Sequence, residues 1–364
     1  MKFSLPKEKL LAGLQTVQNV VSTRTTLPIL SNVLLQAEEG HLRFTTTDLD
    51  VGIRSGVEGS IEKGGATTLP ARRLSTIINA LPSGEITIEV DSKNIASIRC
   101  GQSFFKMFGL PEEEFPPFPK FENAKTFTIQ QKDLKDGLKK TAYAISNDDT
   151  RYVLNGILCS FKENKLTLVA TDGRRLALVD IELEFPESHE TDVIIPTKAV
   201  VELSRLLSDN GEIKVSIGEN QIAFEVGGTL LVSKLIEGHY PNYRQVIPAE
   251  VKERVTLERE QFLSAVHRVS LLASEKSNSV KLVFTKNNLE IAANTPDIGE
   301  AKENLPIQYN GRDFAIAFNP EFLMAPLKNL SEDEIFLDLI DEMSPGLIKI
   351  QGPFLYVLMP MRIS

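Results

Sequence analysis

Five aspartates are the residues best suited, by type and spacing, to carry out chemistry. Asp48 and Asp50 stand two residues apart, Asp148 and Asp149 are adjacent, and Asp172 precedes a glycine. Carboxylate oxygens are the ligands that Mg²⁺ prefers, so such a set would suit metal-dependent phosphodiester hydrolysis. The same residues also suit chain reversals, because Asp and Asn side chains accept hydrogen bonds from nearby backbone N–H groups. We favour the turn interpretation and keep a DNA-processing enzyme as the alternative.

Other catalytic signals are absent from the sequence. It contains no GxxxxGK[ST] phosphate loop, no GxGxxG, no HExxH and no GxSxG motif. Cys100 and Cys159 form no CxxC pair, which excludes a cysteine-based zinc site and fits a reducing compartment. The histidines are widely separated, at His41, His189, His239 and His267. The sequence therefore predicts a protein without catalytic residues, metal or other cofactor.

Length and charge limit the possible functions further. The 364 residues predict two or three domains, and 42% hydrophobic with 24% charged residues is typical of a folded globular protein. A net charge of −9 argues against gripping nucleic acid over the whole surface, so any DNA contact must be local. No apolar run is long enough for a membrane span, and the first residues carry several charges where a secretion signal is apolar. We expect a cytoplasmic protein without membrane contact.

The elements that position these residues are written three times along the chain. Phe127 opens a segment like that at Phe3 after 124 residues, and Val255 opens a third after 252. Each segment predicts a short strand and then a helix with apolar residues at i, i+4 and i+7. The pattern predicts that these helices end at Ser22, Ser146 and Ser274.

The rest of each copy repeats a series of strands and a second helix. The second helices are expected near residues 72–80, 198–207 and 320–330, and alternating stretches at 85–90 and 212–217 predict antiparallel strands. The sequence thus predicts an α+β fold of three domains, each with a helix followed by three strands, twice over. We place the domains at residues 1–122, 123–250 and 251–364, because the segments between them lack apolar periodicity.

Two further features suggest binding. Lys132, Lys135 and Lys139 lie opposite the apolar face of one predicted helix, and Lys198 and Arg205 share a face of another. The C-terminal segment 354–362 is apolar nearly to its end, but the proline in Met359-Pro360-Met361 halts strand pairing. Its flexible thioethers suit an adaptable peptide-binding groove, which we weigh against a place in the core.

The three copies closely resemble the bacterial DNA sliding clamp, the beta subunit of the DNA polymerase III holoenzyme. The resemblance covers the whole chain. Its most specific motifs are Thr26-Leu27-Pro28-Ile29-Leu30, Arg151-Tyr152 with Leu154-Asn155-Gly156, Ala170-Thr171-Asp172-Gly173, Tyr240-Pro241-Asn242-Tyr243 and Met359-Pro360-Met361-Arg362.

The resemblance implies three tandem clamp domains with antiparallel sheets outside and helices lining a ring. Such a ring is a homodimer that encircles double-stranded DNA without sequence preference. It is not an enzyme but a processivity factor that tethers the polymerase III alpha subunit, the clamp loader and other proteins with clamp-binding peptides. Six helices spaced about 10 Å apart would leave a bore of only about 9 Å, whereas twelve would leave about 28 Å, wider than the roughly 16 Å of the two DNA groove depths.

The family pattern also implies three sets of site residues. The deeper part of the peptide pocket would comprise Arg151, Leu154, Thr171, Arg174, Leu176, Pro241, Val246, Val357 and Met359. The adjoining groove would comprise Asn319, Phe322, Met343, Leu358, Pro360, Met361 and Arg362. DNA contacts would come from Arg24, Arg73, Lys198 and the Asn147 to Tyr152 loop, which includes Tyr152. The basic helix faces described above add Lys135, Lys139 and Arg205 to this set. Phe105 and Met107 of one chain would meet Leu271 and Leu272 of the other at the dimer interface.

Overall fold

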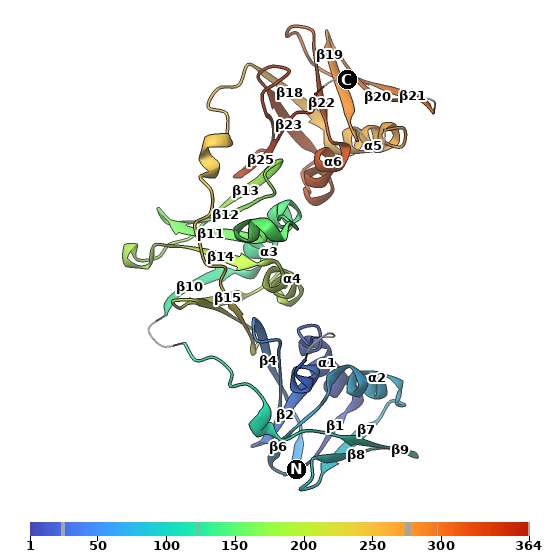
Figure 1. The fold of residues 1–364 in the computed structure, drawn as a ribbon, viewed down its shortest axis with the longest axis vertical. Coiled ribbons are helices and arrows are strands. Elements are labelled where there is room, and N and C mark those ends of the chain that lie inside the picture. The colour runs from blue at the N-terminus through green and yellow to red at the C-terminus, as the bar shows by residue number, and fades with distance from the viewer. Residues whose placement is uncertain (23–25, 122–123, 274–277, 297, 363–364) are drawn as a thin grey trace. The chain divides into compact units, whose positions relative to one another are not determined.

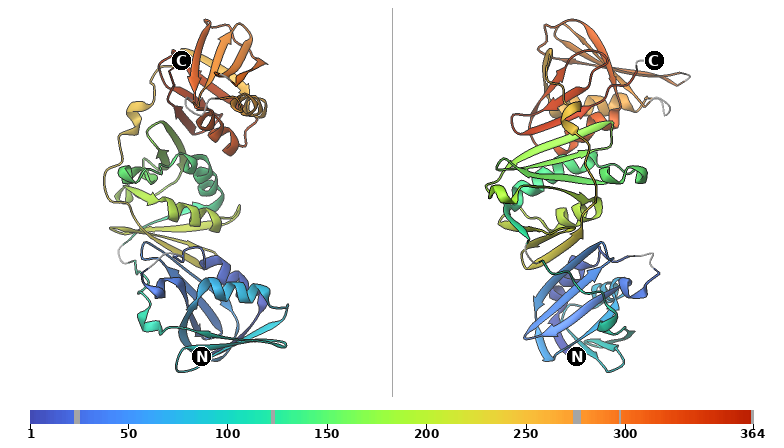
Figure 2. Two further views of the ribbon diagram at one scale, coloured as in Figure 1. Left: turned by 45° about the vertical axis from the view of Figure 1, so that its right-hand side comes forward. Right: turned by 60° about the vertical axis from the view of Figure 1, so that its left-hand side comes forward.

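The computed structural model describes residues 1–22, 26–121, 124–273, 278–296 and 298–362. Contacts divide the chain into two compact units. Unit 1 comprises Met1–Lys132 with Lys198–Leu235, and unit 2 comprises Asp133–Thr197 with Ile236–Ser364. Figure 1 labels most of their helices and strands, and Figure 2 shows the same ribbon from two further directions.

Unit 1 contains a five-stranded and an eight-stranded sheet, in which all neighbouring strands are antiparallel. The smaller sheet has the order β5-β1-β7-β8-β9, with β1 Lys2–Pro6, β5 Ser60–Lys63, β7 Glu85–Val90, β8 Ile95–Cys100 and β9 Ser103–Phe108. The larger has the order β10-β15-β16-β17-β4-β3-β2-β6. Its strands are β2 Asn32–Glu38, β3 His41–Thr47, β4 Val51–Glu58, β6 Gly65–Pro70, β10 Lys125–Gln130, β15 Glu212–Ile217, β16 Gln221–Val226 and β17 Thr229–Lys234.

Unit 2 has the same plan, with an eight-stranded and a four-stranded sheet. The larger has the order β14-β11-β12-β13-β25-β24-β23-β18. Its strands are β11 Gly156–Lys162, β12 Lys165–Thr171, β13 Arg175–Glu182, β14 Thr191–Pro196, β18 Glu253–Glu258, β23 Glu334–Leu339, β24 Gly346–Lys349 and β25 Phe354–Leu358. The smaller has the order β21-β20-β19-β22, with β19 Val280–Thr285, β20 Asn288–Thr295, β21 Gly299–Pro306 and β22 Phe314–Phe318.

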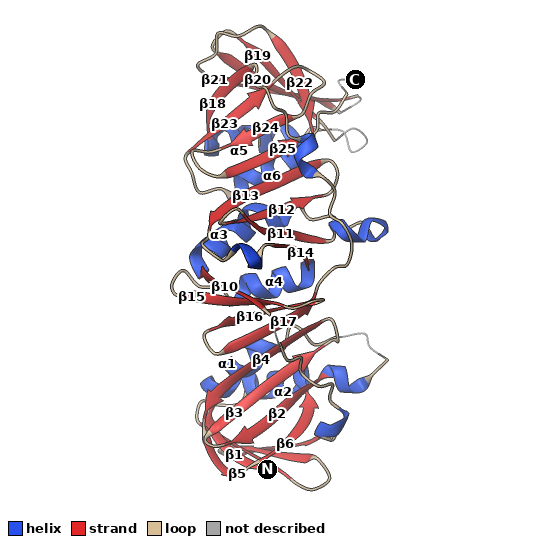
Figure 3. Cartoon of the chain, turned by 90° about the vertical axis from the view of Figure 1, so that its left-hand side faces the viewer, coloured by secondary structure: helices blue, strands red, loops and turns tan. Residues whose placement is uncertain are grey.

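Helices pack against the sheets through the predicted apolar stripes. They are α1 Lys7–Val17, α2 Ala71–Ala80, α3 Gln131–Thr141, α4 Thr197–Leu206, α5 Arg259–Ser270 and α6 Pro320–Asn329. In α5 the buried residues Phe262, Ala265, Val266 and Val269 follow the i, i+3, i+4, i+7 spacing of one helix face. Helix α1 packs against α2 and against strands β3 and β4, and helix α5 packs against α6. In Figure 3, α1 and α2 lie behind the eight-stranded sheet of unit 1.

The glycine in α1 shows how closely helix and sheet approach. A Cβ atom at Gly13 would lie 2.4 Å from the Phe44 ring, and one at Gly137, 124 residues on, would lie 2.8 Å from Leu168. Neither position accepts a side chain without a shift of its neighbours. The repeat therefore preserves a packing contact as well as an element order.

The predicted second helices and the strands at 85–90 and 212–217 are confirmed. The first helix of each copy was predicted too long, because it ends at Val17, Thr141 or Ser270. After α3 the chain tightens into a 3₁₀ turn, Ala142–Ala144, where the Thr141 hydroxyl bonds the Gly137 carbonyl at 2.8 Å. Apolar residues continue past each helix end, so periodicity alone could not locate it.

The domain boundaries stay predictions. The first falls on residues 122–123, outside the described residues, and the second lies between β17 and β18. Strand pairing crosses both boundaries, since β4 pairs with β17 and β13 pairs with β25. This continuity explains why the compact units do not coincide with the three sequence copies.

Candidate functional site

An apolar cluster lies on one face of the larger sheet of unit 2, where β13 meets β25. Leu176 and Val357, two of the predicted pocket residues, are directly paired across these strands and are each 2% exposed. The cluster also contains Leu158, Val169, Ile194 and Leu347. Partly buried residues of the segment after β17 pack against it, among them Tyr240, Tyr243 and Ile247.

The turn from Thr171 to Arg175 lies directly beside this cluster. Asp172 Oδ1 accepts hydrogen bonds from the N–H groups of Arg174 and Arg175 at 2.9 and 3.1 Å, and Thr171 Oγ1 accepts one from Gly173 N at 3.1 Å. Gly173 has φ +84°, which suits glycine. The Arg174 carbonyl accepts a hydrogen bond from Met359 N at 3.0 Å, so the turn positions the chain end.

Arg151 lies over this turn. It lies at a kink, with φ −115° and ψ 54°, between two 3₁₀ turns of the segment Asp149–Leu154, and its Nε donates to Asp148 Oδ2 at 3.0 Å. A Cβ atom at Gly173 would lie 2.7 Å from Arg151 Nη1, which places the guanidinium against the glycine. Hydrogen bonds from Thr150 and then Arg151 lower the pKa of the Asp148 carboxyl. Arg151 thus contacts the Thr171–Arg175 turn, while Leu154 in the same segment is buried.

The start of α6 forms a second part of the candidate site. Asn319 caps the helix, since its Oδ1 accepts from the N–H groups of Glu321 and Phe322 at 2.9 and 3.3 Å. The Phe322 ring lies 4.4 Å from the Arg175 guanidinium, and the Phe322 carbonyl accepts from the Tyr356 hydroxyl at 2.7 Å. Through these contacts with Arg175 of β13 and Tyr356 of β25, the start of α6 is held against the two strands.

The last residues leave the sheet after β25. Met361 N donates to the Ala317 carbonyl at 2.7 Å, Met359 is 43% exposed, and Pro360 is half-buried. Leu358 is 1% exposed and lies on the opposite sheet face from Val357, since adjacent strand residues alternate. Val246, Met343, Pro241 and Arg362 are exposed. The structure thus brings most of the predicted pocket residues into one unit, but it directs Leu358 into the core behind them.

Four residues of the apolar cluster were not predicted from the sequence: Leu158, Val169, Ile194 and Leu347. A signal was present, because β11 and β12 are buried on both faces and carry apolar residues at nearly every position. A solvated antiparallel sheet would alternate instead. Burial raises the pKa of the Tyr240 hydroxyl, which donates to the Val169 carbonyl at 3.4 Å and so stays a neutral donor.

The residues predicted to contact DNA have different environments. Arg24 lies outside the described residues. Arg73, Lys139 and Tyr152 are exposed, and Lys135 is half-buried. Lys198 Nζ pairs with Asp48 Oδ2, and Arg205 Nη1 lies 2.8 Å from Glu202 Oε1.

The predicted dimer residues are also unequal. Leu271 is 71% and Phe105 38% exposed, whereas Met107 is only 7% exposed and belongs to the core of the five-stranded sheet. Leu272 is half-buried. Its Cδ1 lies 4.0 Å from the position a Cβ would take at Gly299, on the edge strand β21.

Three of the five aspartates, Asp48, Asp148 and Asp172, accept hydrogen bonds from backbone N–H groups of their own turns, as the turn interpretation predicts. Asp48 accepts from the N–H groups of Asp50 and Val51 at 3.0 and 2.8 Å, as Asp172 does in its own turn. Within the described ranges, no group of three or more His, Cys, Asp or Glu side chains is arranged to hold a metal ion. No helix in the described part of the chain is long and apolar enough to cross a membrane.

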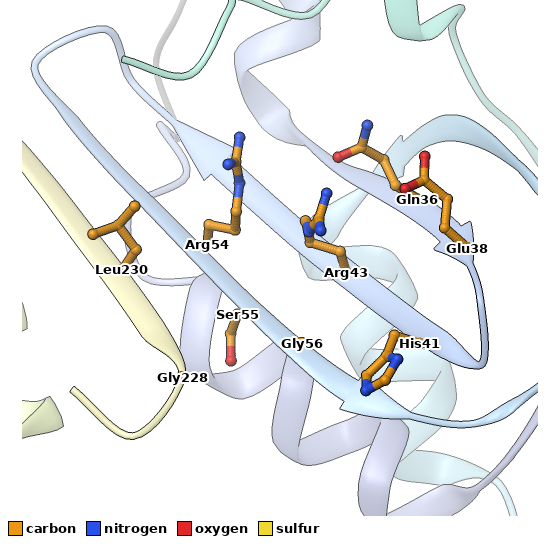
Figure 4. A pocket seen from close by; sticks show the side chains of 9 residues that line it. All are labelled: Gln36, Glu38, His41, Arg43, Arg54, Ser55, Gly56, Gly228 and Leu230. Carbon is orange, nitrogen blue, oxygen red and sulfur yellow. The ribbon is translucent and has the colours of Figure 1, made fainter. Parts of the chain in front are cut away.

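A separate pocket lies over the larger sheet of unit 1 (Figure 4). Arg43 and Arg54 stand beside one another there, and burial, with the nearby Arg43 charge, lowers the pKa of Arg54. Its volume of about 190 Å³ is below the roughly 300 to 1,000 Å³ of small-molecule sites. This pocket is therefore not a candidate active site.

Comparison with known proteins assigns the family. Models of the DNA polymerase III beta subunit match residues 1–119 (N-terminal domain), 128–242 (central domain) and 244–362 (C-terminal domain). The beta sliding clamp of Chlamydia muridarum is 36% identical over 363 residues, covering 100% of this chain and 99% of that protein. The beta sliding clamp of Bacillus subtilis is 35% identical over 361 residues, 96% of each. The crystal structure of the Pseudomonas aeruginosa sliding clamp bound to griselimycin matches with a TM-score of 0.96 at 34% identity, over 100% of both chains. The chain belongs to the beta sliding clamps, the beta subunits of DNA polymerase III.

Proposed function

We propose that two copies of the chain close head to tail into a ring that encircles double-stranded DNA in the cytoplasm. The observation that carries this proposal is the strand order. Both sequence-copy boundaries inside the chain are bridged by antiparallel strand pairs, β4 with β17 and β13 with β25. Strands β9 and β21 are edges of their sheets, each with a strand neighbour on one side among the described residues. Unpaired edges are templates for pairing with another chain, and a head-to-tail contact repeated twice closes a dimer.

The ring would act without chemistry, because beta sliding clamps are processivity factors and not enzymes. Its inner contacts would come from Arg24, Arg73, Lys135, Lys139, Tyr152, Lys198 and Arg205. The net charge of −9 would keep DNA from adhering to the rest of the surface. The ring would therefore stay on DNA by encircling it and not by binding it tightly.

The apolar cluster at β13 and β25 would receive the flexible peptides of the polymerase III alpha subunit, the clamp loader and other partners. A leucine or phenylalanine side chain would lie against Leu176 and Val357, with Met359 beside it. Arg151 and Arg174 would hold the peptide's polar groups. A few central apolar contacts would dominate the affinity, as at most interfaces.

The decisive experiment measures solution mass together with retention on DNA. We expect a dimer that stays on circular DNA and is released when the circle is cut.

Replacing Leu271 and Leu272 by Ala should give monomers, because truncating a buried leucine costs about 2 to 5 kcal/mol. A wild-type dimer mass in that variant at low micromolar concentration contradicts the interface, and Mg²⁺-dependent cleavage of labelled DNA would favour the enzyme alternative.

The DNA contacts have a separate test. Changing Lys135, Lys139, Lys198 and Arg205 to Glu should lower the slope of log affinity against log salt by about 0.9 for each phosphate that the variant no longer neutralises. An unchanged slope would show that these side chains do not face the DNA.

A further inference from the structure

Two arginines stand side by side in the pocket over the larger sheet of unit 1 (Figure 4). Arg43 comes from β3 and Arg54 from β4, and their guanidinium groups rise on the same side of the sheet. Burial and the neighbouring Arg43 charge lower the pKa of Arg54, because the two positive charges repel one another. Within the described residues, no carboxylate forms an ion pair with either arginine. The pocket therefore gathers positive charge that the described part of the chain does not pair.

A glycine opens the space beside these two side chains. Gly56 lies directly opposite Arg43 and two residues along β4 from Arg54. Apart from its chain neighbours, a Cβ at Gly56 would have one described neighbour within 4 Å, the Leu42 carbonyl oxygen at 3.8 Å. A Cβ at Gly228, which also lines the pocket, would have none. The two guanidinium groups thus border a space that these two glycines leave unfilled.

The equivalent position in unit 2 carries a carboxylate. At the repeat offset of 124 residues, Thr167 pairs with Asp180 as Arg43 pairs with Gly56. Asp180 accepts hydrogen bonds from the Thr167 hydroxyl at 2.6 Å and from Lys165 Nζ at 3.3 Å. In unit 2 the chain itself therefore supplies an anion, with its own cation, at the point of the sheet where unit 1 has a glycine and two arginines.

We propose that the pocket of unit 1 binds a phosphate dianion, either as inorganic phosphate or as the terminal phosphate of a nucleotide whose remainder lies in solvent. The anion would lie over Gly56, between the guanidinium groups of Arg43 and Arg54. It would take the place that the Asp180 carboxylate has in unit 2. This site goes beyond the sliding-clamp function and does not depend on a dimer or on DNA.

The charge and geometry of the pocket favour phosphate over a carboxylate. One guanidinium fork matches one carboxylate, whereas two adjacent forks match an anion with three oxygens and nearly two negative charges at neutral pH. The Phe118 ring lies 4.1 Å from the Arg54 guanidinium, and Thr45 Oγ1 accepts a hydrogen bond from Arg54 Nε at 3.4 Å. Arg54 is therefore held in place before an anion arrives, which lowers the entropy cost of binding.

The rest of the lining limits what can bind. Gln36 pairs with Arg43 across β2 and β3, and its amide offers a further donor. Among the described residues that line the pocket, Glu38 carries the only carboxylate, and Figure 4 shows it on the other side of Arg43 from Arg54. The volume of about 190 Å³ is below that of the roughly 300 to 1,000 Å³ sites that enclose whole small molecules. The pocket therefore suits one anionic group.

Calorimetry with inorganic phosphate tests the site in the full-length protein, at constant ionic strength. We expect Arg43→Gln to weaken phosphate binding at least about tenfold, because it removes charge-assisted hydrogen bonds. Gly56→Asp is the sharper variant, since it gives unit 1 the carboxylate that unit 2 has at this position. It should abolish phosphate binding. The matched control Gly56→Ala adds no charge, and binding should persist in it.

Thermal unfolding gives a second measurement that separates lost binding from lost folding. Phosphate should raise the unfolding temperature of the unsubstituted chain and of Gly56→Ala, because a ligand of the folded state stabilises it. It should not raise that of Gly56→Asp or Arg43→Gln, although both should unfold cooperatively. Chloride at the same ionic strength is the reference for all four proteins.

Adenosine 5′-monophosphate and acetate identify the source and the charge of the anion. Tighter binding of the nucleotide than of inorganic phosphate, lost in Gly56→Asp, would identify a nucleotide as the ligand, and the reverse order would identify the free anion. Acetate should bind more weakly than either. Acetate binding as tight as phosphate binding, undiminished phosphate binding in Gly56→Asp, or no binding of either phosphate probe at millimolar concentration would overturn the proposal.

Discussion

The junctions β4–β17 in unit 1 and β13–β25 in unit 2 share a backbone register but differ in the side chains on one sheet face. Leu176 pairs with Val357 in unit 2, where Gly52 pairs with Val232 in unit 1. Next to Leu176 lies an apolar floor that includes Val169; the corresponding residue in unit 1 is Thr45. The fold provides the same strand junction twice, and only the junction in unit 2 carries an apolar cluster at these positions.

The segments that follow the sheets sharpen the contrast. In unit 1 the Phe118 ring lies over the junction, 4.1 Å from the Arg54 guanidinium and 3.1 Å from the position a Cβ would take at Gly52. The chain itself occupies the place beside Gly52. In unit 2, Tyr240 and Tyr243 pack against the cluster, while Met359 and Val246 remain exposed. In unit 1, Phe118 therefore covers the position that corresponds to Leu176 in unit 2.

Removing the chain end should break the binding surface of unit 2 most severely. Deleting Met359 to Ser364 removes the segment held by the Arg174 and Ala317 carbonyls but leaves β25 complete. Since a few central residues carry most interface energy, we expect the affinity for a polymerase tail peptide to fall at least about 100-fold in calorimetry. Lys234→Ala, the matching position in unit 1, should leave it unchanged. Full-strength binding by the truncated dimer would contradict the groove.

Truncating Leu176 in the apolar cluster should have the next largest effect. Leu176→Ala should lower the free energy of unfolding by about 2 to 5 kcal/mol and weaken peptide binding about tenfold or more. Leu168→Ala is the matched control, because Leu168 is equally buried but faces Gly137 on the helix side. It should destabilise the chain similarly while the peptide affinity persists. Equal reductions of affinity in both variants would point to general destabilisation instead.

The sequence predicted the elements well because each helix and most strands carry a local apolar period, as Phe262 and Val266 do in α5. It did not predict that Leu158 and Val169 form the floor, since their contact with Val357 depends on pairing between strands far apart in the chain. Resemblance supplied Leu176 and Val357 but also Leu358, which strand alternation turns to the other face. Local apolar periodicity carries no information about which distant strands pair, and that pairing determines which side chains meet in the cluster.

A larger side chain at Gly52, in the β4–β17 junction of unit 1, tests the position of Phe118. Gly52→Leu should cost about 1 to 3 kcal/mol of unfolding free energy, because the new side chain meets the ring. In a Phe118→Ala background the same change should cost much less, since neighbouring substitutions are not additive. Denaturant unfolding of the four proteins gives the coupling. Identical costs in both backgrounds would mean that the ring does not lie over Gly52.

The smallest effects should come from exchanging residue types in the two equivalent turns. Leu49 adopts φ +80° and Gly173 φ +84°, a backbone region that costs a side chain about 1 to 2 kcal/mol. Leu49→Gly should therefore stabilise unit 1 by up to about 1 kcal/mol after the greater chain entropy of glycine is subtracted. Gly173→Ala should destabilise unit 2 by a similar amount. It should also weaken peptide binding, because its Cβ would displace Arg151 Nη1 from 2.7 Å.

Denaturant unfolding measures the stabilities of both variants, and calorimetry measures the peptide affinity of the Gly173→Ala variant. Destabilisation by Leu49→Gly would show that contacts of its side chain outweigh the backbone strain. Unaltered peptide affinity in Gly173→Ala would show that Arg151 does not hold the ligand.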